Sequence, residues 1–131
     1  MKFVIGGQPS VKKNNQRVSF RGKYPVKYNT PSYTRWQADA RPQIQIQALK
    51  FRDQLPITTP INLQCLFFMG TARRVDLSAL YEGIQDELVK MGVLEDDNYN
   101  IVSSHDGSGV RIDRQNPRME ITITPIKESE L

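Results

Sequence analysis

Side chains suited to phosphate chemistry are concentrated in residues 73–98, RRVDLSALYEGIQDELVKMGVLEDDN. This stretch begins with Arg73-Arg74 and Asp76, and it ends with Asp96-Asp97. Carboxylate oxygens bind divalent cations such as Mg²⁺, and guanidinium groups bind phosphate. One interpretation is therefore an oxygen-ligated metal site beside a phosphate-binding pair of arginines.

The same acids also fit an ordinary structural role. Asp76 stands where a helix N-cap is expected, and Asp96-Asp97-Asn98 has the composition of a turn. A helix of about 15 residues between them would be roughly 22 Å long. A shared metal site therefore requires the chain after Gly92 to turn back along that helix, and the sequence leaves both interpretations open.

Charge is divided unevenly along the chain, although the formal net charge of the whole is only +4. The residues before Asp76 include 13 Lys and Arg against two acids, a net charge of +11, whereas those from Asp76 onward include five against twelve, a net charge of −7. A basic part can neutralise phosphates and an acidic part can hold divalent cations. The combination indicates nucleic-acid binding joined to metal-dependent chemistry. The candidate DNA-binding residues are Lys12, Lys13, Arg17, Arg21, Lys23, Arg73 and Arg74.

Composition argues against several other classes of protein. At 131 residues we expect one domain spanning 1–131. The longest apolar run, residues 65–69, is far shorter than the roughly 18 residues of a membrane span, and the N-terminus lacks a secretory signal core, so we expect a cytoplasmic protein without a membrane partner. A single cysteine and the single His105 make a zinc site improbable.

Hydrophobic periodicity predicts an α+β domain, an α/β-type mixed β-sheet with two helices on one face. The predicted helices begin after the N-cap Ser32 and run to about Arg52, with a kink or break at Pro42, and cover 77–91, with Gly92 as the stop. The Trp36 side chain is expected in the core. The predicted strands are 2–6, 16–20, 24–28, 61–70, 98–104 and 118–124, of which the second and third form a hairpin, and residues 126–131 are expected to fray.

The hairpin at 16–28 alternates basic residues with Phe20, Tyr24 and Tyr28. Such a surface suits contacts with a sugar-phosphate backbone and stacking on exposed bases. A solvated hairpin without a partner explains the segment taken alone equally well.

Residues 73–98 resemble the core of the RusA family of Holliday-junction resolvases, small endonucleases commonly carried by phages and prophages. The family pattern is a basic run, then Asp-Leu-Asp-Asn, a lysine one turn later, an Asp-Ala-Leu helix end, and an Asp-Asp pair opening the next strand. The early segment GQPSVKKNNQR also looks similar to the family's. The matching residues of the core are Arg73-Arg74, Asp76-Leu77, Leu80, Asp86 with Leu88, and Asp96-Asp97.

The resemblance implies a small RusA-like α/β homodimer whose acids bind Mg²⁺, with Mn²⁺ as a substitute. It implies an enzyme, a metal-dependent endonuclease that nicks a four-way DNA junction symmetrically, in the bacterial cytoplasm if a phage or prophage encodes it. A two-fold dimer presents two equivalent sites, which suits a substrate with approximate two-fold symmetry.

The chain departs from the family pattern at two places. Ser78 and Ala79 replace the second Asp and the Asn, and Glu82 replaces the lysine. Because residues four apart share a helix face and side chains lean toward the N-terminus, Glu82 could supply the carboxylate missing at Ser78. The predicted catalytic and metal-binding residues are therefore Asp76, Glu82, Asp96 and Asp97, with Ser78 as an auxiliary hydrogen-bonding group.

The same departures also fit a protein that holds branched or single-stranded DNA without cutting it. A third possibility is an unrelated structural protein whose acids only cap helices and turns.

Overall fold

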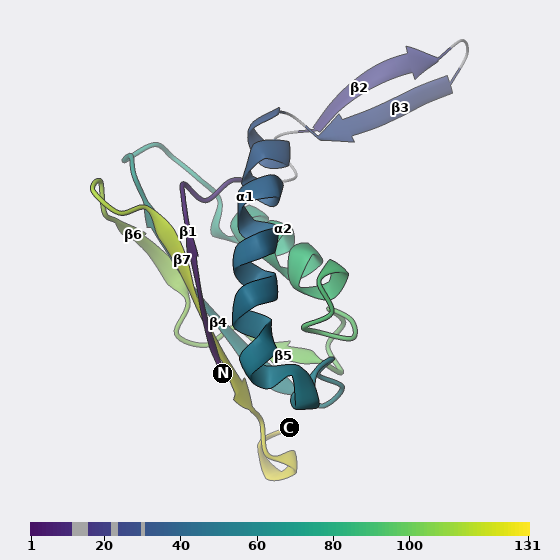
Figure 1. Cartoon of the computed structure of the whole chain (residues 1–131), viewed down its shortest axis with the longest axis vertical. Coiled ribbons are helices and arrows are strands. Elements are labelled where there is room, and N and C mark those ends of the chain that lie inside the picture. The colour runs from purple at the N-terminus through teal and green to yellow at the C-terminus, as the bar shows by residue number, and fades with distance from the viewer. Residues whose placement is uncertain (12–15, 22–23, 30) are drawn as a thin grey trace.

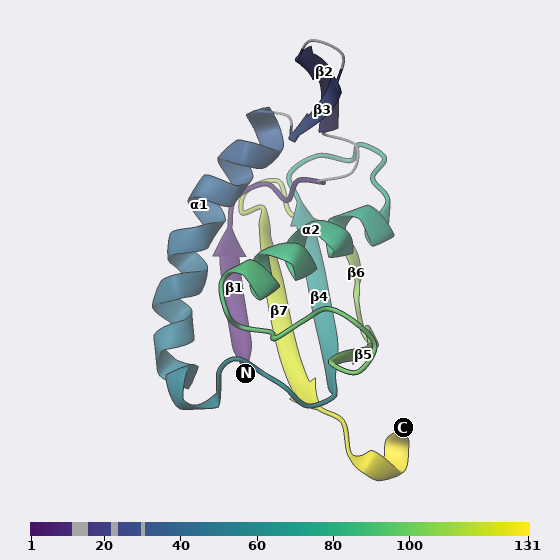
Figure 2. The ribbon, with the colours of Figure 1, turned by 90° about the vertical axis from the view of Figure 1, so that its right-hand side faces the viewer.

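The computed structural model describes residues 1–11, 16–21, 24–29 and 31–131, and for 16–21 and 24–29 it describes the backbone only. Five strands form one mixed sheet, and β2 and β3 form a separate antiparallel hairpin. Both α-helices lie on one face of the sheet (Figure 1, Figure 2), which confirms the predicted α+β class. The elements are β1 (Lys2–Gly6), β2 (Gln16–Arg21), β3 (Tyr24–Asn29), α1 (Pro31–Ala48), the 3₁₀ turn η2 (Leu49–Gln54), β4 (Ile61–Met69), α2 (Leu77–Lys90), β5 (Val102–Ser104), β6 (Gly109–Ile112), β7 (Arg118–Pro125) and the 3₁₀ turn η3 (Glu128–Glu130).

Strand β4 is the centre of the sheet. On one side it pairs antiparallel with β7, which pairs antiparallel with the edge strand β1. On the other side it pairs in parallel with two short strands in succession, β5 opposite Ile61 and Asn62, and β6 opposite Leu66 to Met69. Parallel neighbours cannot be joined by a tight turn, so α2 forms the crossover between β4 and β5.

The core lies between this sheet and the two helices. Burial alternates strictly along β4, so Leu63, Cys65 and Phe67 are fully buried while their neighbours face the open side of the sheet. Helix α1 contributes Trp36, which is 5% exposed as the sequence predicts, and its ring stacks on Tyr33 with centroids 5.4 Å apart. The core-facing side of α2 carries Leu80, Ile84 and Leu88.

Some predicted boundaries are wrong. Helix α1 begins at Pro31, before the predicted N-cap Ser32, and it continues through Pro42 without a break. Only Val102–Ser104 of the predicted strand 98–104 is a strand, because the Asn98 carbonyl accepts the N–H groups of Ile101 and Val102 and so closes a turn.

Two short elements were not predicted. Strand β6 is four residues long, begins with Gly109 and follows a turn that contains Gly107, so its local sequence resembles a turn, and only pairing with β4 makes it a strand. The C-terminal residues that were expected to fray contain the turn η3.

A buried ion pair joins the two helices. Glu87 of α2 is fully buried, and its carboxylate accepts hydrogen bonds from Arg41 Nε at 2.8 Å and Nη2 at 3.2 Å, and from Gln37 Nε2 at 2.5 Å. The Arg41 side chain is 44% exposed, so it reaches from water into the interface. Both oxygens of the buried carboxylate are thereby satisfied, which a charge in the interior requires.

Because Glu87 is fully buried and Arg41 is partly exposed, removing each residue should change the free energy of unfolding by a different amount. Arg41→Ala leaves the Glu87 carboxylate buried with only Gln37, so we expect a loss of about 3 kcal/mol in the free energy of unfolding measured with urea. Glu87→Gln leaves Arg41 free to hydrate and should cost only about 1 kcal/mol.

Lys50→Ala, an exposed cation in η2, is the matched control and should change stability by less than about 0.5 kcal/mol. An Arg41→Ala variant as stable as this control would show that the ion pair does not support the helix interface.

Two glutamines of α1 cover the free edge of β1. Gln47 Oε1 accepts the Val4 N–H and its Nε2 donates to the Val4 carbonyl, both at 2.7 Å. Gln43 makes the same pair of bonds with Gly6, at 2.7 and 3.1 Å. A side-chain amide thus replaces the backbone of a neighbouring strand, and the edge cannot recruit a further strand at these residues.

Replacing both glutamines by alanine should expose this edge. In Gln43→Ala/Gln47→Ala we expect the amide hydrogens of Val4 and Gly6 to exchange roughly tenfold faster, the equivalent of a hydrogen bond of about 1.4 kcal/mol, as measured by NMR. Gln45→Ala, an exposed glutamine on the same helix, should leave both rates unchanged. Equal rates in all three proteins would contradict the assignment.

No helix in the described ranges is long and apolar enough to cross a membrane.

Candidate metal and phosphate site

The chain turns back beside α2 after the helix ends. Gly92 adopts a φ of 77°, which favours glycine, and the N–H groups of Val93 and Leu94 donate to the Leu88 carbonyl at 2.9 and 3.2 Å. Leu94 is buried and pairs in a parallel bridge with Ile57. Figure 2 shows the returning segment running back along α2 toward β5. The reversal that a shared site requires is therefore present.

The returning segment carries Asp96-Asp97 to the side of α2. Both residues are exposed, and the Asp97 N–H donates to Asp96 Oδ1 at 2.7 Å. The pKa of Asp97 is raised, chiefly by partial burial and then by the hydrogen bond and negative charge of Asp96, with a smaller effect from the charge of Asp86. Burial therefore has the largest effect on this pKa, and the neighbouring carboxylates add to it.

Asp76 immediately precedes α2 and is exposed. Its backbone is extended, with φ −85° and ψ 124°, and its carbonyl accepts the N–H groups of Ala79 and Leu80 at 3.1 and 3.2 Å. The carboxylate makes no capping hydrogen bond. Asp76 thus occupies the N-cap position, but the usual reason for an aspartate there is missing.

Ser78 and Glu82 are exposed on α2, and Asp86 continues their row as the partner of Lys90 in an ion pair of 2.9 Å. The charge of Asp86 contributes to the raised pKa of Asp97. Asp86 lies ten residues after Asp76, which is roughly 15 Å along the helix axis. Within the described residues, no three His, Cys, Asp or Glu side chains are grouped so that they could hold one metal ion. The assignment of Asp76 and Glu82 to a common site with the acidic pair stays a prediction.

The predicted basic residues fall into three groups. Arg73 and Arg74 are exposed in the segment between β4 and α2. Arg17 and Arg21 lie on β2, where the backbone register places them opposite Tyr28 and Tyr24 of β3. Figure 1 shows this hairpin beyond the N-terminal end of α1. Three further residues, Lys12, Lys13 and Lys23, lie outside the described residues.

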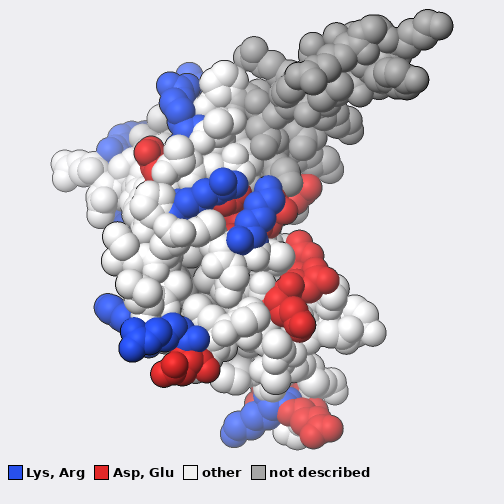
Figure 3. Space-filling model, turned by 45° about the vertical axis from the view of Figure 1, so that its right-hand side comes forward, with Lys and Arg blue, Asp and Glu red and all other residues white. Residues whose placement is uncertain are grey.

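Acidic and basic side chains lie next to one another at several places on the face drawn in Figure 3. Acidic side chains form one group near its right-hand margin, and basic side chains lie beside them and above. Acids and bases are therefore neighbours on this face of the folded chain, although most of them are separated along the sequence.

His105 entered the sequence analysis only as an argument against zinc. In the structure its side chain packs against helix α2. The ring stacks on Tyr81 with centroids 4.1 Å apart, and its Nε2 lies 2.6 Å from Gln85 Oε1. Burial lowers the pKa of His105. Tyr81 precedes Glu82 on the helix, so this stack flanks the row of candidate residues. No motif in the sequence indicates the contact, because it joins residues 20 or more positions apart.

A surface cavity of about 820 Å³ lies elsewhere, between residues 99–106, which include β5, and the C-terminal turn η3. Its lining includes Asp106 and Glu130, and it contains none of the predicted site residues. Two carboxylates disfavour a phosphate there, so we do not place the candidate site in this cavity.

Removing one of the crowded acids should stabilise the fold. The raised pKa of Asp97 means that its charged form is disfavoured in the folded state, so this aspartate lowers stability above its folded pKa and ceases to do so as the pH falls through that value. We expect Asp97→Asn to raise the melting temperature at pH 7, and the gain to shrink as the pH approaches about 4. Calorimetry at several pH values measures the effect.

Asp53→Asn, which removes an exposed carboxylate from η2, is the control and should leave the melting temperature nearly unchanged. A lower melting temperature for Asp97→Asn than for the control would show that the Asp97 carboxylate stabilises the folded state, which contradicts the prediction.

No protein-family model matches this chain, and a search of curated proteins found no similar sequence. The resemblance to the RusA family therefore depends on the residues of the sequence alone and stays a prediction.

Proposed function

We propose that this protein is a metal-dependent endonuclease that hydrolyses phosphodiester bonds in branched DNA, with a four-way junction as substrate and a homodimer as the active form. Such an enzyme would serve recombination, repair or phage DNA processing in the cytoplasm of a bacterial host. The observation that carries the proposal is the return of the chain after α2, which brings Asp96-Asp97 beside the helix whose N-terminus carries Asp76.

The donor chemistry fits Mg²⁺. Proteins hold this ion through one or two carboxylates together with water and substrate phosphate, so an adjacent acidic pair is sufficient and a group of three is not needed. Asp96 and Asp97 would hold the ion, and Asp76 and Glu82 are the further predicted ligands. The bound ion would polarise the scissile phosphate and lower the pKa of a coordinated water.

The remaining residues would bind and orient the DNA. Arg73 and Arg74 follow β4 and stand three and two residues before Asp76, so a phosphate held by their guanidinium groups would lie near the start of α2. Ser78 lies two residues after Asp76 and is exposed, so its hydroxyl group could donate a hydrogen bond. The Asp76 carboxylate is exposed and makes no capping hydrogen bond to the helix. It therefore does not stabilise the helix in this way, which supports the arrangement.

A second candidate function is DNA binding without cleavage. It is favoured by Ser78 and Glu82 at the positions where the family has aspartate and lysine. The two functions share the same binding surface and differ only in turnover.

Cleavage of a synthetic four-way junction distinguishes them. We expect nicking with Mg²⁺ or Mn²⁺ and none with EDTA, and we expect Asp76→Asn and Glu82→Gln each to reduce the rate at least roughly 100-fold. Junction binding in EDTA should survive or tighten, because removing a carboxylate removes repulsion of phosphate. Asp53→Asn is the control and should cleave normally.

Metal binding has a readout that does not depend on cleavage. Mg²⁺ should raise the melting temperature of the wild-type protein more than that of Asp97→Asn, because a ligand that binds only the folded state stabilises it. Junction binding without cleavage under any metal would establish the second function, and normal cleavage by Glu82→Gln would remove Glu82 from the site.

A further inference from the structure

We infer that two arginines of the acidic half, Arg111 and Arg114, complete a phosphate-binding surface with Arg73 and Arg74 at the end of the sheet where β4 and β6 terminate. The ligand of this surface is the sugar-phosphate backbone of DNA. The inference rests on the proposed function and extends it, because the charge pattern along the sequence assigns no DNA-binding role to the basic residues after Asp76.

The parallel pairing of β6 with β4 brings the two pairs of arginines to the same end. Met69, the last residue of β4, lies opposite Ile112, the last residue of β6, and the Asp113 N–H donates to the Met69 carbonyl at 2.8 Å. The segments that follow, 70–74 and 113–117, therefore leave the sheet side by side.

Close contacts hold the two segments together. A Cβ built on Gly70 would lie 2.8 Å from Pro117 Cγ, so the chain after β4 passes directly against the loop before β7. The Gly70 N–H donates to Gln8 Oε1 at 2.7 Å, and the Gly7 N–H donates to the Pro117 carbonyl at 3.0 Å. The surface thus belongs to a packed end of the sheet.

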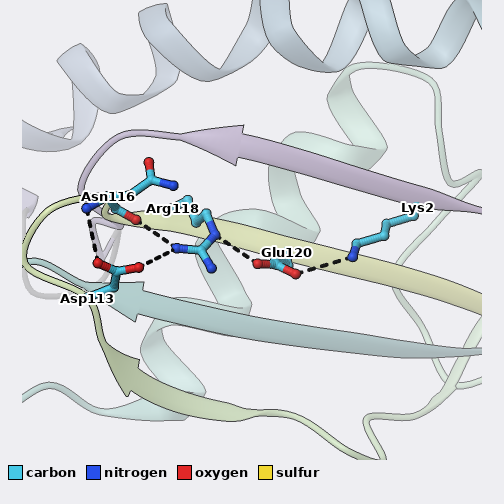
Figure 4. A network of polar contacts seen from close by, with 5 residues as sticks. All are labelled: Lys2, Asp113, Asn116, Arg118 and Glu120. Carbon is cyan, nitrogen blue, oxygen red and sulfur yellow. Dashed lines mark hydrogen bonds and ion pairs between the residues drawn. The ribbon is translucent and has the colours of Figure 1, made fainter.

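The nearest acid is already neutralised. Asp113 accepts a hydrogen bond from Arg118 Nη1 at 2.9 Å, and Arg118 Nε donates to Glu120 at 2.8 Å (Figure 4). The Arg118 guanidinium also lies 3.8 Å from the centroid of the Phe68 ring, which fixes its position on the open face of the sheet. The Arg118 guanidinium therefore pairs with Asp113 and Glu120. These two acids do not attract Arg111 or Arg114.

The four arginines of the inferred surface are all exposed, and within the described residues none of them forms an ion pair. The Arg111 guanidinium lies along its own strand, where Nη1 donates to the Val110 carbonyl at 3.1 Å, and the missing side chain of Gly109 provides the space. The turn that carries Arg114 is closed by the Asn116 N–H, which donates to Asp113 Oδ1 at 3.2 Å. Guanidinium groups with free donors are suited to phosphate oxygens.

Phosphate contacts of this kind should appear in the salt dependence of binding. The affinity for a fluorescent four-way junction, measured by anisotropy over a series of salt concentrations in EDTA, should fall less steeply for Arg111→Gln/Arg114→Gln than for wild type. Each lost contact with duplex DNA reduces the slope of log K against log salt by roughly 0.9, so the double variant should be shallower by roughly 1.8.

The matched control is Lys50→Gln/Arg52→Gln, which removes the same charge from exposed residues of η2, near the end of the sheet where β4 begins. It should keep the wild-type slope, which separates local contacts from a change in net charge. A second comparison, Arg73→Gln/Arg74→Gln, should reduce the slope as the first variant does.

The outcomes separate this inference from the proposed function. If wild type binds the junction and Arg73→Gln/Arg74→Gln weakens binding, but Arg111→Gln/Arg114→Gln matches the η2 control, the inference is wrong and the proposed function stands. If wild type shows no salt-dependent affinity for DNA, the proposed function itself fails. Melting temperatures within a few degrees of wild type would confirm that each variant is folded.

Discussion

The parallel pairing of β4 with β5 and β6 is the constraint on which the rest of the structure depends. A strand pair of this kind needs a crossover, and α2 provides it on the face of the sheet that also carries α1. The helix must then be followed by a returning chain, because β5 begins beside the start of β4. One topological requirement thereby places the acidic pair along α2 and also brings the ends of β4 and β6 together.

The carboxylates in helix α2 and in the segment after it have two kinds of surroundings. Toward the core, the Glu87 carboxylate is buried and fully satisfied by Arg41 and Gln37, so its charge holds α1 against α2. In the returning segment, Asp96 and Asp97 are exposed, and partial burial, followed by the hydrogen bond and charge of Asp96, raises the pKa of Asp97.

The fold was largely predictable because its signals are local. Alternation along residues 61–69 and the helical spacing of Leu80, Ile84 and Leu88 depend only on neighbours in the sequence. The candidate site was less predictable. The reversal after Gly92 was recognised as a requirement, but the sequence could not show whether the pair would lie beside Asp76 or beside Asp86. The stacking of His105 on Tyr81 and the strand β6 depend on contacts between distant residues, and no local pattern indicates them.

The sequence by itself determined the α+β class, helix α2 with acids before and after it, and a division of the chain into a basic and an acidic half. Those features follow from side-chain type and spacing, which do not depend on how the chain folds. Only the tertiary structure decided that β6, from the acidic half, ends beside β4, so that the segments carrying Arg73 and Arg114 leave the same end of the sheet, and that Asp113 is paired with Arg118. Charge summed along a chain is not charge summed over a surface, because strand pairing sets which residues become neighbours.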